Sequence, residues 1–219
     1  MQRLLKLNRY IDLARYKSVL CLDGDLPEAE FFAEAQLPVI AADGATNKLI
    51  SMNVAPDLVI GDLDSVNHSY LTLLQYERVE DQSLSDFQKA LRYMTKHDLM
   101  PMIILGVNGG HIDHIINNIN IFMQGTNNVF IADDVIGYIL DSSNIFSLPL
   151  GTKVSIIGIP YCRLSSQGLK WELADFETAF PGQNSCFNRV SDEPVRLKVH
   201  EGKALLMVYA TEVTDAGLF

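Results

Sequence analysis

Positive charge is scarce in this sequence. Lys and Arg together number 17 against 27 Asp and Glu, which leaves a formal net charge of −10 at pH 7. No segment gathers several basic residues. A nucleic-acid backbone is normally bound by clustered Lys and Arg, so we expect no nucleic-acid partner. An acidic protein that binds a polyphosphate needs metal ions as well as lysines to neutralise it.

Cysteines and long apolar segments are also few. The three cysteines, Cys21, Cys162 and Cys186, are far apart and form no Cys-x-x-Cys pair. This spacing predicts reduced thiols in a cytoplasmic protein, and it argues against a disulfide framework or a zinc site. Residues 1–19 mix Arg and Lys with apolar residues, so we expect neither a signal peptide nor a transmembrane helix, and no membrane partner. Hydrophobic residues make up 48% of the chain, enough for a substantial core.

Short continuous apolar runs separated by helical patterns fill the chain as far as residue 140. Such runs, bounded by Gly and Asp, are typical of parallel strands that helices cover on both faces. The runs are Ser18–Leu22, Pro38–Ala42, Leu58–Ile60, Met102–Val107 and Val129–Ala132. Asp or Gly stands close behind every run, and open α/β sheets bind ligands beyond the carboxyl ends of their strands. Residues 1–140 are therefore predicted to form a Rossmann-like α/β domain with a metal-bearing acidic edge.

The pattern changes after Asp141, where short and often alternating apolar segments are divided by Gly, Pro and Asn turns. This pattern is typical of antiparallel strands. The segments are Phe146–Leu150, Val154–Ile159, Leu164–Leu173, Val195–Val199 and Ala204–Tyr209. Residues 141–219 are predicted to form a small C-terminal antiparallel β domain, a sandwich or barrel, and we take the β-sandwich as the prediction. A unit of this size would rest on the first domain or on a second subunit for stability.

Two carboxylates, Asp62 and Asp64, directly follow the third apolar run. In an extended backbone, residues two apart point to the same side, so both carboxylates can reach one hard cation such as Mg²⁺. The alternative is that one of them caps the next helix while the other is only solvated.

A helix is predicted to open within the segment Asp81–Ala90, where Asp86 and Lys89 are three residues apart and hence adjacent on one face. A functional interpretation gives Asp86 to a metal ion and Lys89 to a phosphate oxygen. The alternative is a capping box formed by Ser83 and Asp86, beside an ordinary surface ion pair.

A glycine-rich turn, Gly109–Gly110, runs into a second predicted helix. Such a turn offers backbone N–H groups and the positive end of the helix dipole to an anion. Asp113 either takes part in the chemistry or only stabilises that dipole. The apolar positions of this helix predict a buried stripe. They are Ile112, Ile115, Ile116, Ile119 and Phe122 or Met123. Neither the P-loop motif GxxxxGK[ST] nor the dinucleotide motif GxGxxG occurs.

The order of these segments resembles the thiamine pyrophosphokinase family, which transfers a diphosphoryl group from ATP to thiamine and releases AMP. The resemblance runs over nearly the whole chain. The matching segments are Ala42–Asn47, Pro56–Ser65, Asp81–Gln82, Ser85–Ala90, Gly106, Gly109–Gly110, Asp113–His114, Asn118, Gly168–Trp171 and the loop with Ser185 and Asn188.

The resemblance implies a magnesium-dependent cytoplasmic kinase with ATP and thiamine as its partners. It implies that Mg²⁺ is held by Asp62, Asp64 and Asp86, and that Lys89 and Asp113 join these acids in catalysis. The implied ATP contacts are Asp43, Asn47, Gln82, Ser85, Lys89, Gly109, Gly110 and His111. The implied thiamine contacts are Trp171, Ser185 and Asn188. The active form implied is a homodimer with the thiamine site at the subunit interface.

The chain departs from the family pattern at His111, where the family usually has arginine. An arginine forks onto phosphate and stays charged, whereas a histidine is partly uncharged near neutrality. Two other functions therefore stay open. One is a metal-dependent phosphohydrolase that uses Asp62, Asp64 and the His111–His114 cluster on two metals. The other is a nucleotide-sensing module, which would bind ATP and form no AMP.

Overall fold

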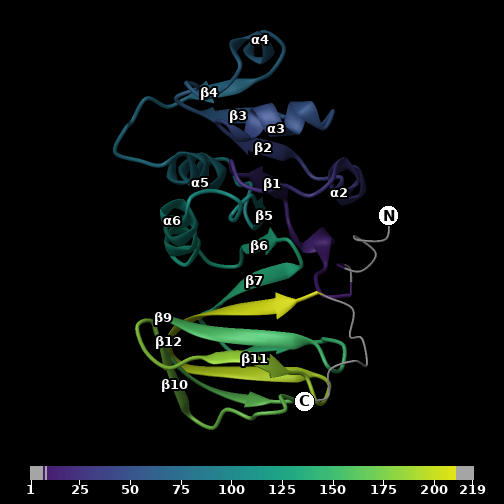
Figure 1. Ribbon diagram of the computed structural model, residues 1–219, viewed down its shortest axis with the longest axis vertical. Coiled ribbons are helices and arrows are strands. Elements are labelled where there is room, and N and C mark those ends of the chain that lie inside the picture. Colours follow the sequence, from purple (N-terminus) through teal and green to yellow (C-terminus); the bar gives the residue numbers. More distant parts are fainter. Residues whose placement is uncertain (1–6, 8, 211–219) are drawn as a thin grey trace. The chain divides into compact units, whose positions relative to one another are not determined.

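The computed structural model describes Leu7 and residues 9–210, which divide into two compact units (Figure 1). Unit 1 consists of Leu13–Asp133, and unit 2 consists of the described residues among 2–12 and 134–219. The sequence placed the division at 140/141, whereas the structure places it at 133/134. The reason is that residues 135–140 form a strand that pairs within unit 2.

Unit 1 is built on a parallel sheet with the strand order β4-β3-β2-β1-β5-β6. The strands are β1 (Ser18–Cys21), β2 (Val39–Ala42), β3 (Leu58–Gly61), β4 (Tyr76–Arg78), β5 (Met102–Leu105) and β6 (Val129–Ala132). All residues of β1, β2 and β5, three inner strands of the sheet, are buried, so both faces of these strands are covered. This explains their continuous apolar sequences and confirms the predicted parallel sheet.

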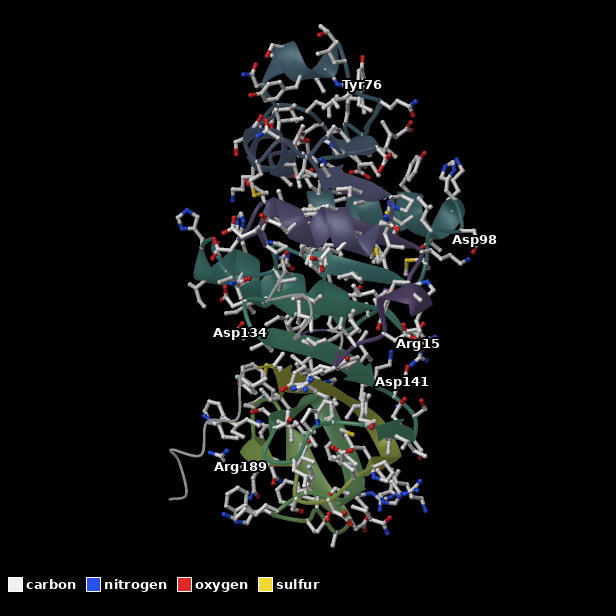
Figure 2. The ribbon with its side chains drawn as sticks, turned by 90° about the vertical axis from the view of Figure 1, so that its right-hand side faces the viewer. Arg15, Tyr76, Asp98, Asp134, Asp141 and Arg189 are labelled. Atoms are coloured by element: carbon white, nitrogen blue, oxygen red, sulfur yellow. The ribbon has the colours of Figure 1, made fainter. Side chains whose placement is uncertain are left out.

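Strand β4 was not predicted from the sequence. It is an edge strand that pairs only with β3 among the described residues, and all three of its residues are exposed. Figure 2 shows Tyr76, the first residue of this strand. An exposed edge strand lacks the apolar run by which the others were recognised.

The helices with described bounds all belong to unit 1. They are η1 (Leu13–Arg15), α2 (Ala29–Ala35), α3 (Ala45–Ser51), α4 (His68–Leu71), α5 (Asp86–Lys96) and α6 (Ile112–Phe122). Helix α5 packs on β2 and β3 and also contacts α6. Its N-cap is Ser85, which forms a capping box with Gln88. The capping box considered for Ser83 and Asp86 is therefore wrong, because the helix begins only at Asp86.

Helix α6 corrects a second expectation. Ile121 and Phe122 are buried, but Ile112 and Ile116 of the predicted stripe are exposed. Ile115 and Ile119 of the stripe are partly buried, as is Asn118, so the covered side of the helix is narrower than predicted and leaves out Ile112 and Ile116. No helix among the described residues combines the length and apolar composition needed to cross a membrane.

Unit 2 is an antiparallel β unit. Its strands are β7 (Val135–Leu140), β8 (Asn144–Phe146), β9 (Lys153–Gln167), β10 (Phe176–Ala179), β11 (Ser185–Arg189) and β12 (Val195–Tyr209). The long strands β9 and β12 pair along most of their lengths. β11 and β10 pair with opposite ends of β9, and β7 and β8 with opposite ends of β12. An apolar core that includes Ile156, Leu164 and Leu206 lies in this unit. The predicted antiparallel C-terminal domain is confirmed.

The strand boundaries of unit 2 differ from those predicted. Pro160 and Gly202 interrupt the alternating pattern without ending a strand, so segments predicted as separate belong to β9 and to β12. Bulges lie between Val199 and Ala204, and Gly202 has a φ of 75°. Residues 168–173 form a loop rather than the end of a strand.

Candidate active site

The loops that follow β1 and β5 meet at the carboxyl edge of the parallel sheet. The N–H of Asp25 donates to the carbonyl oxygen of Asn108 at 2.8 Å. A side chain on Gly24 would collide with the carbonyl oxygens of Gly106 and Asn108, so this close approach requires glycine. The strand order reverses between β1 and β5, which is the position where open α/β sheets bind ligands.

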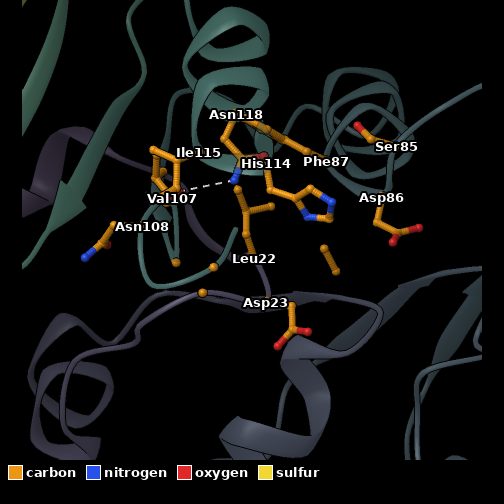
Figure 3. A pocket seen from close by; sticks show the side chains of 14 residues that line it. Leu22, Asp23, Ser85, Asp86, Phe87, Val107, Asn108, His114, Ile115 and Asn118 are labelled. Carbon is orange, nitrogen blue, oxygen red and sulfur yellow. Dashed lines mark hydrogen bonds between the residues drawn. The ribbon is translucent and has the colours of Figure 1, made fainter. Parts of the chain in front are cut away.

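A pocket of about 290 Å³ lies at this position. It is lined by the loops after β1 and β5 and by the first turns of α5 and α6 (Figure 3). His114 points from α6 into the space between Asp23 and Asp86. The side-chain Oδ1 of Asn108, which also lines the pocket, is buried and has no hydrogen-bond partner among the described residues. The pocket therefore offers both charged groups and an unused polar atom to a ligand.

Three carboxylates converge after β2 and β3. One oxygen from each of Asp43, Asp62 and Asp64 lies within 4.8 Å of the others. Asp43 is only 3% exposed, and its Oδ1 has no hydrogen-bond partner among the described residues. A buried carboxylate oxygen without a partner is unfavourable unless a cation or a donor meets it. Oxygen ligands of this kind suit Mg²⁺, so the residues present fit a hard divalent cation.

The surroundings of Asp43 raise the pKa of its carboxyl group. Burial is the main cause, and the negative charges of Asp86, Asp62 and Asp64 act in the same direction, while a hydrogen bond from Ser65 opposes them. All these carboxylates are therefore mutually repulsive when ionised. A bound cation would remove that repulsion, which is a second indication of a cation site.

The chain between Asp62 and Asp64 does not have the extended conformation expected from the sequence. Leu63 has a φ of 68°, in the left-handed region, and its side chain is buried. The two carboxylates converge because the chain turns at Leu63, so the predicted proximity is correct and its predicted cause is wrong.

Lys89 lies beneath the acidic group. It is only 4% exposed, and its Nζ donates to Asp86 Oδ1 at 2.9 Å and to Asp62 Oδ2 at 3.2 Å. Burial alone would lower the pKa of Lys89, but the hydrogen bonds and charges of Asp86 and Asp62 outweigh it and raise that pKa. The interpretation of this pair as an ordinary surface ion pair is therefore wrong.

Gln82 completes the surroundings of Asp62. Its Nε2 donates to Asp62 Oδ2 at 2.7 Å. This hydrogen bond, together with the hydrogen bond and the charge of Lys89, holds the pKa of Asp62 below its usual value although burial opposes the shift. Asp62 is therefore kept ionised, as a metal ligand must be.

Asn47 and Lys48, neighbours on α3, fasten two of the site loops. Asn47 Nδ2 donates to the carbonyl oxygen of Ser65 at 2.7 Å, and its Oδ1 accepts from the N–H of Asn67 at 3.0 Å. Lys48 Nζ donates to the carbonyl oxygen of Gly24 at 2.9 Å and pairs with Asp23 at 3.0 Å. The Asn47 amide thus holds the loop that carries Asp62 and Asp64 by two hydrogen bonds.

The glycine-rich turn precedes α6 as predicted. Gly110 and Ser85 line the pocket, and a side chain on Gly110 would meet open space. His111 is the N-cap of α6 but its side chain makes no capping hydrogen bond. Asp113 is exposed, and its Oδ1 accepts from the N–H of His114 at 2.9 Å. Neither His111 nor Asp113 lines the pocket.

The residues expected to contact thiamine lie together in unit 2. Asn188 is buried, and its side chain accepts from the N–H of Trp171 at 3.2 Å and donates to the carbonyl oxygen of Trp171 at 2.7 Å. Its Nδ2 also donates to Ser185 Oγ at 3.3 Å. Asn188 therefore supports the backbone of Trp171, whose side chain is 54% exposed.

Sequence reasoning missed several polar groups of the site. Asp23, Lys48 and Asn108 were not among the predicted site residues, although Asp23 and Asn108 directly follow two of the apolar runs. That position was the available signal. Lys48 has no comparable signal, because its partner atoms belong to a loop more than twenty residues away.

The fold and the site define an α/β protein with an acidic ligand-binding edge, followed by an antiparallel β unit. The family models "Thiamin pyrophosphokinase, catalytic domain" and "Thiamin pyrophosphokinase, vitamin B1 binding domain" match residues 30–131 and 141–204. Together they cover most of the chain, which therefore belongs to the thiamin pyrophosphokinase family.

Individual relatives agree with this assignment. The chain is 25% identical over 194 residues to "Thiamine pyrophosphokinase 1" of Oryza sativa subsp. japonica, covering 72% of this chain and 74% of that one. It is 24% identical over 195 residues to "Thiamine pyrophosphokinase 2" of Arabidopsis thaliana, covering 73% of each. The fold matches thiamin pyrophosphokinase from Candida albicans with a TM-score of 0.75, at 18% identity and 90% coverage of each chain. The yeast enzyme matches with a TM-score of 0.76, at 16% identity and coverage of 94% and 89%.

Proposed function

We propose that this protein transfers the diphosphoryl group of ATP to the hydroxyl group of thiamine, which gives thiamine diphosphate and AMP. Membership of the family supports the reaction, and both family models fall on the units that carry the expected residues. The alternatives, a phosphohydrolase or a sensing module, receive no support from the relatives, which are named as thiamine pyrophosphokinases.

The single observation that carries the proposal is the convergence of Asp43, Asp62 and Asp64, with a buried oxygen of Asp43 that lacks a partner. We assign Mg²⁺ to these three residues. When bound, Mg²⁺ supplies positive charge that neutralises the ATP phosphates. Asp86, which the family resemblance gives to the metal, is paired with Lys89, and this pair holds the neighbouring Asp62 in place.

The proposed reaction is an in-line displacement. The hydroxyl oxygen of thiamine forms a bond to the β-phosphorus of ATP. The bond from that phosphorus to the oxygen that bridges the α- and β-phosphates breaks, and AMP leaves with this oxygen. The hydroxyl proton passes to a base, for which Asp113 is the candidate on the first turn of α6. The pocket between β1, β5, α5 and α6 takes the nucleotide, and the turn at Gly110, with the positive end of the α6 dipole behind it, meets its phosphates.

Thiamine binding is assigned to unit 2, with the exposed indole of Trp171 as the surface for the positively charged thiazolium ring. Asn188 holds the Trp171 backbone and also donates to Ser185 Oγ. Since the acids belong to unit 1 and the indole to unit 2, both units are needed for one reaction. We assign the two contributions to different chains of a homodimer.

Mixing two impaired variants, assayed at a thiamine concentration well below the raised KM, tests the reaction and the homodimer together. Asp62→Asn should abolish turnover with the circular dichroism spectrum unchanged, and Trp171→Ala should raise KM for thiamine far more than KM for ATP. If each site combines two chains, unfolding and refolding the two variants together should restore about a quarter of the wild-type activity, because random pairing leaves one intact site in half of the dimers. Full activity of Asp62→Asn would refute the metal assignment, and absence of any restoration would place each site within one chain.

A further inference from the structure

A positively charged side chain of the protein itself lies over the indole ring of Trp171. The Nζ of Lys170, the preceding residue, lies 4.9 Å from the centroid of the ring. A cation at this distance from an indole face is attracted by the electron density of the ring, and tryptophan is the strongest partner for such contacts. The exposed aromatic surface on which the proposed function depends is thus already in contact with a cation.

The backbone around this contact is fixed at several points. Glu172 Oε1 accepts from the N–H groups of Gly168 and Leu169 at 2.7 and 3.0 Å. The N–H of Lys170 donates to the carbonyl oxygen of Arg189 at 2.8 Å, and Asn188 holds both polar backbone groups of Trp171. Because the backbone is held on both sides, the lysine and the indole are presented together and only their side chains are free to move.

No carboxylate in the described part of the chain pairs with the Lys170 ammonium, and the side chain is exposed. The indole is therefore its nearest favourable partner apart from water. An ammonium group at an exposed indole is held weakly, so a ligand with additional contacts can replace it.

We propose that Lys170 is a resident cation on the Trp171 ring, which a positively charged ligand must displace in order to bind there. This makes Lys170 a specificity-determining residue. It competes with any cation for the ring and lowers the affinity of each, so that a ligand with further contacts is favoured over a small cation. The inference rests on the proposed function in taking the thiazolium ring of thiamine as that ligand.

The competition predicts that removing the charge of Lys170 tightens the binding of cations. An exposed cation–π contact corresponds to a factor of about two to five in affinity, so thiamine should bind about two- to fivefold more tightly to Lys170→Met. Methionine keeps an apolar side chain of similar length. Lys170→Arg keeps the charge and should bind thiamine no more tightly than the wild type.

The fluorescence of Trp171 measures this binding directly, because it is the only tryptophan in the sequence. Three ligands are titrated into the wild type, Lys170→Met and Lys170→Arg. They are thiamine, tetramethylammonium and an uncharged thiazole alcohol, which has the thiazole ring and hydroxyl group of thiamine without the positive charge. Lys198→Met is the matched control, since it removes one positive charge from an exposed position of the same unit. Tighter binding of thiamine and tetramethylammonium to Lys170→Met alone, with the uncharged alcohol unaffected, is the expected result.

Three results would overturn the inference. They are unchanged or weaker binding of the cations to Lys170→Met, equal tightening of the uncharged alcohol, and equal tightening in Lys198→Met. Failure of the proposed function gives a different result, in which thiamine does not change the Trp171 fluorescence of the wild type and no AMP is formed. In that case the tetramethylammonium titration still decides whether Lys170 occupies the ring.

Discussion

Replacing Lys89 with methionine should destabilise unit 1 far more than an ordinary lysine substitution. The Lys89 side chain is 3% exposed and pairs with Asp62 and Asp86, whose side chains are 15% and 39% exposed. Removing one partner of a buried ion pair costs roughly 3–5 kcal/mol, because the remaining charges stay buried. Water reaches Asp86, so we expect a loss near the lower limit, about 3 kcal/mol in the free energy of unfolding.

Lys17→Met is the matched control, because Lys17 pairs with Asp98 at 2.8 Å with both side chains exposed, 47% and 90%. Its loss should stay below about 1 kcal/mol. Urea unfolding followed by helical circular dichroism reports on unit 1, which contains all helices with described bounds, while Trp171 fluorescence reports on unit 2. A loss in Lys89→Met no larger than in Lys17→Met would refute the buried role of Lys89.

Three further predictions address the site residues. Asn47→Ala removes the two hydrogen bonds of the Asn47 side chain to the loop that carries Asp62 and Asp64. The Mg²⁺ concentration for half-maximal activity should therefore rise at least about tenfold, with KM for thiamine unchanged. An unaltered Mg²⁺ requirement would refute this positioning role. His111→Arg should lower KM for ATP, because a guanidinium stays charged and forks onto phosphate; an unchanged or higher KM would mean that position 111 does not meet phosphate. In the native protein only Cys186 should react with iodoacetamide, because Cys21 and Cys162 are buried and burial raises the pKa of Cys162 to about 11. Thiamine but not ATP should slow this reaction, since Cys186 directly follows Ser185, which is assigned to thiamine. Equal labelling of all three thiols would contradict this prediction.

The buried strands of unit 1 were predictable because each has a short apolar run and a polar residue at its end. The exposed strand β4 and the two merged strands of unit 2 were not. Tyr76–Arg78 are exposed, so nothing in their composition indicates a strand. Pro160 lies within β9 and Gly202 within β12, and both residue types normally mark the end of a strand.

The candidate site was predictable in its composition and less so in its contacts. Asp62, Asp64, Asp86 and Lys89 do gather, but the structure groups Asp43 with the first two and pairs Asp86 with Lys89. The partners of each acid depend on the turns at Asp43 and Leu63, both of which have positive φ. No local sequence pattern predicts these turns. The amides of Asn47 and Asn188 bond to distant backbone atoms, which a single sequence does not reveal.

The most direct test of the proposed reaction is a product assay with the purified protein, ATP and Mg²⁺, in the presence and absence of thiamine. Phosphorus NMR separates AMP, inorganic phosphate and thiamine diphosphate. We predict AMP and thiamine diphosphate in equal amounts, formed only when thiamine is present. Inorganic phosphate released regardless of thiamine, or ATP binding without any AMP, would contradict the account.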